Sequence, residues 1–169
     1  LPNEQAALEL INEVLPVLRS RGVPAKLQLI GANPTAAMKA AANGCDDVDI
    51  TGPVESVLPY LKQRCLIVLP IRLGGGTRLK ILESFAASRP VISTAKGAEG
   101  IDAEDGKHLM IRESAADFAD AAIALWHDSQ TRAMLCRNAL DLVTERYSLE
   151  STRELIRNSV LETIRTFHS

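Results

Sequence analysis

Three consecutive glycines, with arginine and lysine close by, are the residues of this chain whose types and spacing best suit chemistry. The glycines at 74–76 follow a continuous apolar run and precede an amphipathic pattern, so they lie between a predicted strand and a predicted helix. The first N–H groups of a helix carry partial positive charge, and glycine lets an anion approach the backbone closely. With Arg72, Arg78 and Lys80 beside it, this turn suits a diphosphate. The alternative is a sharp strand-to-helix turn that requires glycine torsions and binds nothing.

Two common phosphate-binding motifs do not fit this turn. The dinucleotide fingerprint GxGxxG requires a third glycine where this chain has Leu79. The P-loop requires Gly-Lys followed by Ser or Thr, and residues 77–79 do not supply it. The functional interpretation that remains is an anion site at the start of a helix.

Glu83 strengthens this interpretation, because it shares a helix face with Gly76 seven residues earlier. Seven residues at about 1.5 Å each place its carboxylate roughly 10 Å from the turn, where it could accept ribose hydroxyls. The alternative is an exposed ion pair between Lys80 and Glu83, worth only about a few tenths of a kcal/mol. Glu83 falls beside the predicted apolar arc of this helix, which consists of Leu79, Ile81, Leu82, Phe85 and Ala86.

Length and composition indicate one globular domain. The chain has 169 residues, of which 46% are hydrophobic and 24% charged, and its net charge of −2 gives no reason to expect a nucleic-acid partner. We find no transmembrane segment in the sequence. Cys45, Cys65 and Cys136 are too few and too scattered for a disulfide framework or a zinc site. We therefore expect a cytoplasmic protein, with the inner face of a membrane as an open alternative.

Short apolar runs alternate with helical patterns along the chain, which predicts an α/β fold: a Rossmann-like, doubly wound parallel sheet with helices on both faces. Strands are predicted at 26–30, 48–51, 65–69, 90–93 and 108–111. Helices are predicted from Asn3 to Leu18, with a bend or a lost hydrogen bond at Pro16, and at 35–42, 56–63, 77–87, 115–126, 131–146 and 149–167. Such a domain normally opens with a strand, and this chain opens with a helix. We therefore expect a strand to be missing upstream.

The segment 70–101, PIRLGGGTRLKILESFAASRPVISTAKGAEGI, resembles the donor-binding half of GT-B glycosyltransferases of family 4, the glycosyl transferases group 1. The resemblance extends over essentially all 169 residues. It implies a C-terminal domain that holds a nucleoside-diphosphate sugar and faces an N-terminal acceptor domain, which this sequence lacks. Further matching motifs are Pro2-Asn3, Ile50-Thr-Gly-Pro-Val54, Pro59-Tyr60-Leu61, Asp105-Gly106-Lys-His108 and Glu145-Arg-Tyr-Ser148.

The resemblance also implies roles for single residues. Glu83 matches the second glutamate of the family's E-x7-E motif, which contacts the donor ribose. Gly76, Thr77 and Arg78 match the positions whose backbone amides meet the diphosphate. Val54 matches the segment that lines the base.

The sequence departs from the family pattern at the donor sugar. The first glutamate of E-x7-E, which usually contacts the sugar, falls on Gly75 here. Glu99, in a predicted loop at 97–100, is the nearest acidic replacement. The alternative for this segment is a polar crossover loop without a ligand.

A second departure concerns the cations that neutralise the diphosphate. The family's arginine and lysine lie around the first helix of this domain, where this chain has residues 2–3, Pro-Asn. Arg72, Arg78 or Lys80 could compensate. We expect no metal and no cofactor, because helix N–H groups and cations can meet the diphosphate charge in this architecture.

The resemblance implies a fragment of a retaining-type glycosyltransferase that is inactive alone, because proximity of both substrates supplies much of the rate. A GT-B nucleotide-sugar epimerase fragment and a non-catalytic interaction module with a degenerate site stay open as alternatives. The catalytic groups are unassigned, and His108 is interpreted as structural. We expect the final predicted helix to expose an apolar stripe or to self-associate through it. The stripe consists of Leu155, Ile156, Val160, Ile164 and Phe167.

Overall fold

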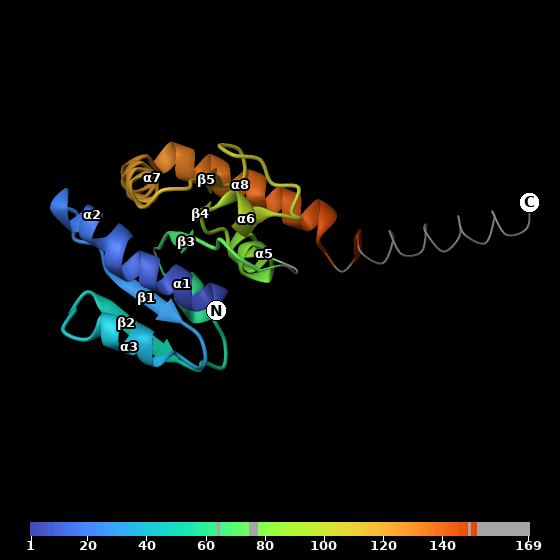
Figure 1. Ribbon diagram of the computed structural model, residues 1–169. Coiled ribbons are helices and arrows are strands. Elements are labelled where there is room, and N and C mark those ends of the chain that lie inside the picture. Colours follow the sequence, from blue (N-terminus) through green and yellow to red (C-terminus); the bar gives the residue numbers. More distant parts are fainter. Residues whose placement is uncertain (64, 75–77, 149, 152–169) are drawn as a thin grey trace, which may run out of the picture.

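A computed structural model describes residues 1–63, 65–74, 78–148 and 150–151 of the chain. All of its strand pairs are parallel, and helices flank them (Figure 1), which confirms the predicted α/β class. The strands are β1 (Leu27–Ile30), β2 (Val48–Gly52), β3 (Ile67–Leu69), β4 (Val91–Ser93) and β5 (Met110–Ile111). The helices are α1 (Pro2–Glu9), η1 (Leu10–Val14), α2 (Leu15–Ser20), α3 (Ala36–Ala42), α4 (Leu58–Leu61), α5 (Leu79–Ala86), α6 (Ala95–Ala98), α7 (Ala115–His127) and α8 (Ser129–Arg146).

The strands form two sheets instead of the single sheet that the alternation of elements predicts. β1 pairs with β2, and β4 lies between β3 and β5. Within the described residues, no strand pairs with the second edge of β1 or of β3. In the part of the chain that the structure describes, no hydrogen-bond ladder therefore joins the two sheets.

The first helix is continuous but changes its winding near Pro16. α1 leads into one π-helical segment, η1, in which the N–H of Leu15 bonds to the carbonyl of Leu10. Pro16, which has no N–H to donate, follows in the first turn of α2. A bend or a lost hydrogen bond was predicted at Pro16, and the structure has a wider, π-helical turn just before it.

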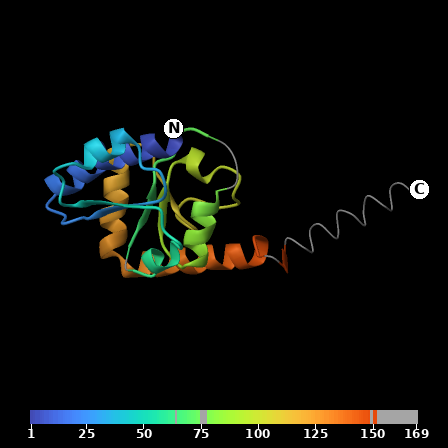
Figure 2. The same ribbon diagram turned by 90° about the horizontal axis from the view of Figure 1, so that it is seen from below.

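Two apolar clusters cover opposite faces of the β3–β5 sheet. Ile92 packs with residues of η1, α2 and α7, whereas its neighbour Val91 packs with residues of α5 and α8. Successive residues of a strand point to opposite faces, so this division follows from the strand geometry. Figure 2 shows α7 and α5 on the two sides of the strands.

Three local predictions were wrong. Residues 97–98, which were predicted to belong to a loop at 97–100, instead end the short helix α6, because Thr94 caps this helix by accepting a hydrogen bond from the N–H of Gly97 at 2.8 Å. Leu79 and Ala86 are exposed, with Leu79 at 59%, although both were assigned to the buried arc. Leu79 opens α5 next to the glycine turn, while Ile81 and Phe85 carry the packing toward α8.

The predicted final helix at 149–167 and its apolar stripe lie outside the described residues. No helix in the part that the structure describes is long and apolar enough to cross a membrane. The thiols of Cys45, Cys65 and Cys136 are free and half-buried, as the sequence predicts. Burial raises the pKa of both Cys65 and Cys136.

Candidate functional site

The predicted site residues lie along the carboxyl edge of the two sheets. Val54 follows β2 and Arg72 follows β3, while Glu113, which the sequence did not mark, follows β5. Since all strand pairs are parallel, the carboxyl ends of the strands within each sheet meet at one edge, which is where open α/β sheets bind ligands. Gly75, Gly76 and Thr77 lie outside the described residues, so the site is built below from the residues on either side of them.

The start of α1 lies against the glycine turn and the start of α5. Gly74 has a φ of 100°, and a β-carbon there would come within 3.4 Å of the Pro2 ring. The Lys80 ammonium donates a hydrogen bond of 2.7 Å to the side-chain carbonyl of Asn3. Two helix N-termini therefore converge at this place. Neither helix start has a side-chain cap among the residues that the structure describes, and the first N–H groups of a helix have no partner within the helix.

Arg78 supports the turn with its side chain. Its side chain is only 12% exposed, and Nη2 donates to the carbonyls of Lys96 at 2.8 Å and Gly74 at 3.4 Å. Arg78 also precedes the first residue of α5, and its carbonyl accepts the N–H of Ile81. The side chain thus joins the turn to α6, while its buried Nε has no hydrogen-bond partner among the described residues.

Lys80 and Glu83 do not form the ion pair that was the alternative to a ribose site. Both residues are described, and no salt bridge within 4.0 Å connects them. Lys80 bonds to Asn3 instead, and burial lowers the pKa of its ammonium, while the nearby Glu83 opposes this shift. The Glu83 carboxylate is exposed and makes no hydrogen bond within the described part of the chain. It is therefore available to a ligand.

Glu99 lies beside the turn, at the end of α6. Its carboxylate pairs with Lys96 and lies 3.4 Å from Nη2 of Arg78. The hydrogen bond from Lys96 lowers the pKa of Glu99, and Arg78 lowers it further. Glu99 is thus a charged acceptor next to the turn, and the structure brings it there from 21 positions away in sequence.

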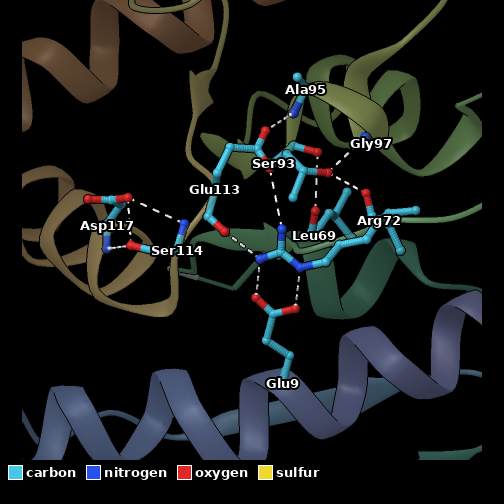
Figure 3. A network of polar contacts seen from close by, with 11 residues as sticks. Glu9, Leu69, Arg72, Ser93, Ala95, Gly97, Glu113, Ser114 and Asp117 are labelled. Atoms are coloured by element: carbon cyan, nitrogen blue, oxygen red, sulfur yellow. Dashed lines mark hydrogen bonds and ion pairs between the residues drawn. The ribbon is translucent and has the colours of Figure 1, made fainter.

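Arg72 is engaged in a network that the sequence did not predict (Figure 3). Its guanidinium forms a bidentate pair with Glu9, in which Nε and Nη2 donate over 2.9 and 2.6 Å. Nη1 lies 3.3 Å from the Glu113 carboxylate, whose other oxygen accepts the N–H of Ala95 at 2.8 Å. The hydrogen bond to Glu9 raises the pKa of Arg72. No periodicity or motif marks Glu9 or Glu113, so only the fold could reveal them.

Two further candidates have different environments. Val54 is half-buried two residues after β2 and stays a candidate for contact with a base. His108 is 7% exposed, and its Nδ1 accepts the N–H of Glu104 at 3.0 Å. Burial lowers the pKa of His108. Its buried hydrogen bond supports the structural interpretation made from the sequence.

The fold agrees with comparisons to known proteins. The family model described as "Glycosyl transferases group 1" matches residues 1–128, well over half of the chain. The chain belongs to this family. The comparison with curated proteins finds no match.

Solved structures of other proteins share the fold at low identity. A mutant of S. aureus TarM in complex with fondaparinux, alpha-GlcNAc-glycerol and UDP has 22% identity and a TM-score of 0.77, over 94% of this chain and 33% of that chain. Anabaena HepE in complex with UDP and glucose has 16% identity and a TM-score of 0.71, over 87% of this chain and 43% of that one. The chain thus spans less than half of these two proteins.

The C-terminal domain of LpcC, a glycosyl transferase group 1 family protein from Francisella tularensis, is similar in extent. It has 19% identity and a TM-score of 0.59, over 82% of this chain and 94% of the other. This chain therefore corresponds in fold to the C-terminal domain of that protein.

Proposed function

We propose that the chain is the donor-binding domain of a glycosyltransferase and holds a nucleoside-diphosphate sugar at the carboxyl edge. One observation carries this proposal: the starts of α1 and α5 converge beside Lys80, with an exposed, unpaired carboxylate at Glu83 further along α5. Positive dipole ends and an ammonium suit a diphosphate. A carboxylate about one turn from Lys80 suits the hydroxyls of the attached ribose.

The diphosphate is held by backbone N–H groups and by Lys80. The amides are those of Gly75, Gly76, Thr77 and Arg78, together with the first N–H groups of α5. Lys80 adds a full positive charge, and Asn3 orients it. Because these groups supply the positive charge themselves, we expect binding to require no metal ion.

The base and the donor sugar occupy opposite sides of the diphosphate. Val54 lines the base at the end of β2. Glu99, kept ionised by Lys96 and Arg78, accepts hydroxyls of the sugar. Glu99, at the end of α6, would thus replace the glutamate that the family usually has at the position of Gly75.

The transfer step uses the same positive groups. As the bond between the sugar and the diphosphate breaks, negative charge grows on the departing diphosphate, and preorganised N–H donors and Lys80 stabilise it. The acceptor requires groups that this domain does not supply, which agrees with the greater length of the TarM and HepE chains. We therefore expect these residues alone to bind donor but to transfer no sugar.

Calorimetric titration with UDP, GDP and ADP tests the proposal. We expect at least one of them to bind saturably, with the same affinity in the presence of EDTA. An absence of binding by all three would favour an interaction module that kept the fold and lost the site. Affinity that disappears with EDTA would show that a metal is required.

A further inference from the structure

The Lys96–Glu99 pair lies on α6 and at its end, directly beside the glycine turn. Oε2 of the Glu99 carboxylate accepts a hydrogen bond from the Lys96 ammonium and lies 3.4 Å from Nη2 of Arg78. The same nitrogen of Arg78 lies 3.4 Å from the carbonyl oxygen of Gly74. The carboxylate is therefore no more than two hydrogen-bond lengths from the turn. Figures 1 and 2 both show α6 beside α5.

The backbone of α6 is fixed against the end of β4. Thr94 accepts the N–H of Gly97 at 2.8 Å. A β-carbon at Gly97 would lie 2.2 Å from the hydroxyl oxygen of Ser93, so the helix packs closely on the strand. Lys96 and Glu99 are 43% and 57% exposed and extend from this fixed backbone. Groups that are already in place lose less freedom when a ligand binds.

The Lys96–Glu99 pair offers a hydrogen-bond acceptor and a donor side by side. Within the described residues, the hydrogen bonds and ion pairs of Glu99 all involve Oε2, so Oε1 is left for a ligand. The Lys96 ammonium has three N–H groups, one of which is directed to Glu99. A hydroxyl both donates and accepts. Two adjacent hydroxyls can therefore bond to Oε1 and to the ammonium at the same time.

The charges of the pair favour a neutral ligand. Lys96 and Glu99 cancel each other, and the largely buried Arg78 donates to backbone carbonyls. The hydrogen bond from Lys96 lowers the pKa of Glu99, so Glu99 is a carboxylate at neutral pH. A carboxylate on the ligand would lie against this negative charge, whereas a hydroxyl can donate to it.

We propose that the Lys96–Glu99 pair binds two adjacent hydroxyls of the donor sugar, and that this sugar is a neutral hexose. This inference rests on the proposed function, in which the diphosphate lies at the glycine turn and the sugar is attached to it. Lys96 is then a sugar contact in addition to Glu99. The alternative is an exposed ion pair that binds nothing and contributes little to stability.

Calorimetric titration of the full chain compares a nucleoside diphosphate with its hexose derivative. The nucleotide is whichever of UDP, GDP and ADP binds, and the derivative is UDP-glucose or UDP-galactose, GDP-mannose, or ADP-glucose. For Glu99→Gln and for Lys96→Met we expect the Kd of the hexose derivative to rise at least about fivefold. The Kd of the nucleoside diphosphate should change less than about twofold, because Arg78 keeps its bonds to the two backbone carbonyls.

The matched control is the Glu104–Lys107 pair, an exposed ion pair with the same residue types and the same spacing. Among the described residues it shares no hydrogen bond or ion pair with the glycine turn or α6, and the Lys107 carbonyl bonds to Asn138 in α8. Glu104→Gln and Lys107→Met should therefore change neither Kd. Thermal unfolding shows whether each variant is folded, and either member of the Lys96–Glu99 pair serves if the other variant is not.

Each other outcome overturns the proposal in a distinct way. If both ligands weaken equally in the Glu99 and Lys96 variants, the pair supports the turn and does not contact the sugar. If neither ligand weakens, or if the control variants lose as much affinity, the pair has no role in sugar binding. Tighter binding of UDP-glucuronate than of UDP-glucose and UDP-galactose would show that the site prefers a carboxylate. If none of UDP, GDP and ADP binds, the proposed function fails first.

Discussion

The two edges of the parallel sheets differ in how their charges are satisfied. The amino edge carries a hollow of about 520 Å³ between α2 and α7, lined by Val23, Pro24, Ile123 and Trp126 among others. At its rim, Arg21 is neutralised by Asp120. At the carboxyl edge, the starts of α1 and α5 lie beside Lys80, and within the described residues they have no side-chain cap and the exposed Glu83 makes no ion pair. We therefore expect an anionic ligand at the carboxyl edge, where helix dipoles and Lys80 supply positive charge, and not at the amino-edge hollow.

In a neighbouring hollow on the amino side, the positive charges also already have partners. It has a volume of about 240 Å³ and is lined by two arginines, Arg89 and Arg132. Both guanidinium groups donate to backbone carbonyls: Arg89 to those of Ala87 and Gln63, and Arg132 to those of Leu125 and Trp126. These cations hold turns and helix ends in place. Positive charge alone therefore does not make a site here.

The largest effect should come from Gly76→Val at the carboxyl edge. In place of glycine, a β-branched side chain would crowd a diphosphate that approaches the backbone closely. We expect UDP binding to fall below detection in calorimetry, while circular dichroism shows an intact fold. If the variant is folded and binds UDP normally, the diphosphate does not bind at this turn.

Glu83→Gln should have the next largest effect. It removes a charge-assisted acceptor from the ribose, which corresponds to a loss of about 1–3 kcal/mol, or roughly 5- to 150-fold in Kd. Stability should not change, since the Glu83 side chain is exposed. Unaltered affinity would contradict the ribose role.

The pH dependence of binding should report on Lys80. Burial lowers the pKa of its ammonium, and only the charged form attracts the diphosphate. The ammonium is charged below its pKa, so affinity for UDP should fall as pH rises through a range below that of an ordinary lysine. Lys80→Met should bind several-fold more weakly at pH 7 and lose this dependence, as measured by titration between pH 7 and 10. The same pH profile in both proteins would show that another group titrates.

The smallest effect should come from Asp120→Asn at the amino edge. It breaks an exposed ion pair, which is worth about 0–1 kcal/mol of stability. We expect a small decrease in the unfolding temperature and the same Kd for UDP as the unaltered chain. A large loss of affinity would mean that the amino-edge hollow takes part in binding.

The sequence predicted the elements of the fold better than the contacts of the site. The apolar runs around β1 to β4 and the periodicity of α7 and α8 depend on nearby residues, so their positions were predicted to within a few residues. The division of the strands into two sheets was not predicted, because strand pairing depends on residues far apart in sequence. Leu79 has the apolar character of a core residue but opens its helix at the surface.

The contacts that define the site connect residues far apart in sequence. Arg72 and Glu9 are 63 positions apart, and Lys80 and Asn3 are 77 apart. From the sequence, Arg72 and Lys80 were assigned to the glycine turn only because they are within a few residues of it along the chain. Only the fold assigns Arg72 to a network with Glu9 and Glu113, and places Lys80 at the start of α1.

Amide NMR spectra of the chain, recorded while UDP is added, test the central claim most directly. If a nucleoside diphosphate binds at the carboxyl edge, the amide signals of Val54, Arg78, Lys80 and Glu83 should shift saturably with a single Kd. The signals of residues that line the amino-edge hollow, such as Gly22 and Ile123, should stay in place. Shifts confined to the amino-edge hollow, or none at any UDP concentration, would contradict the account.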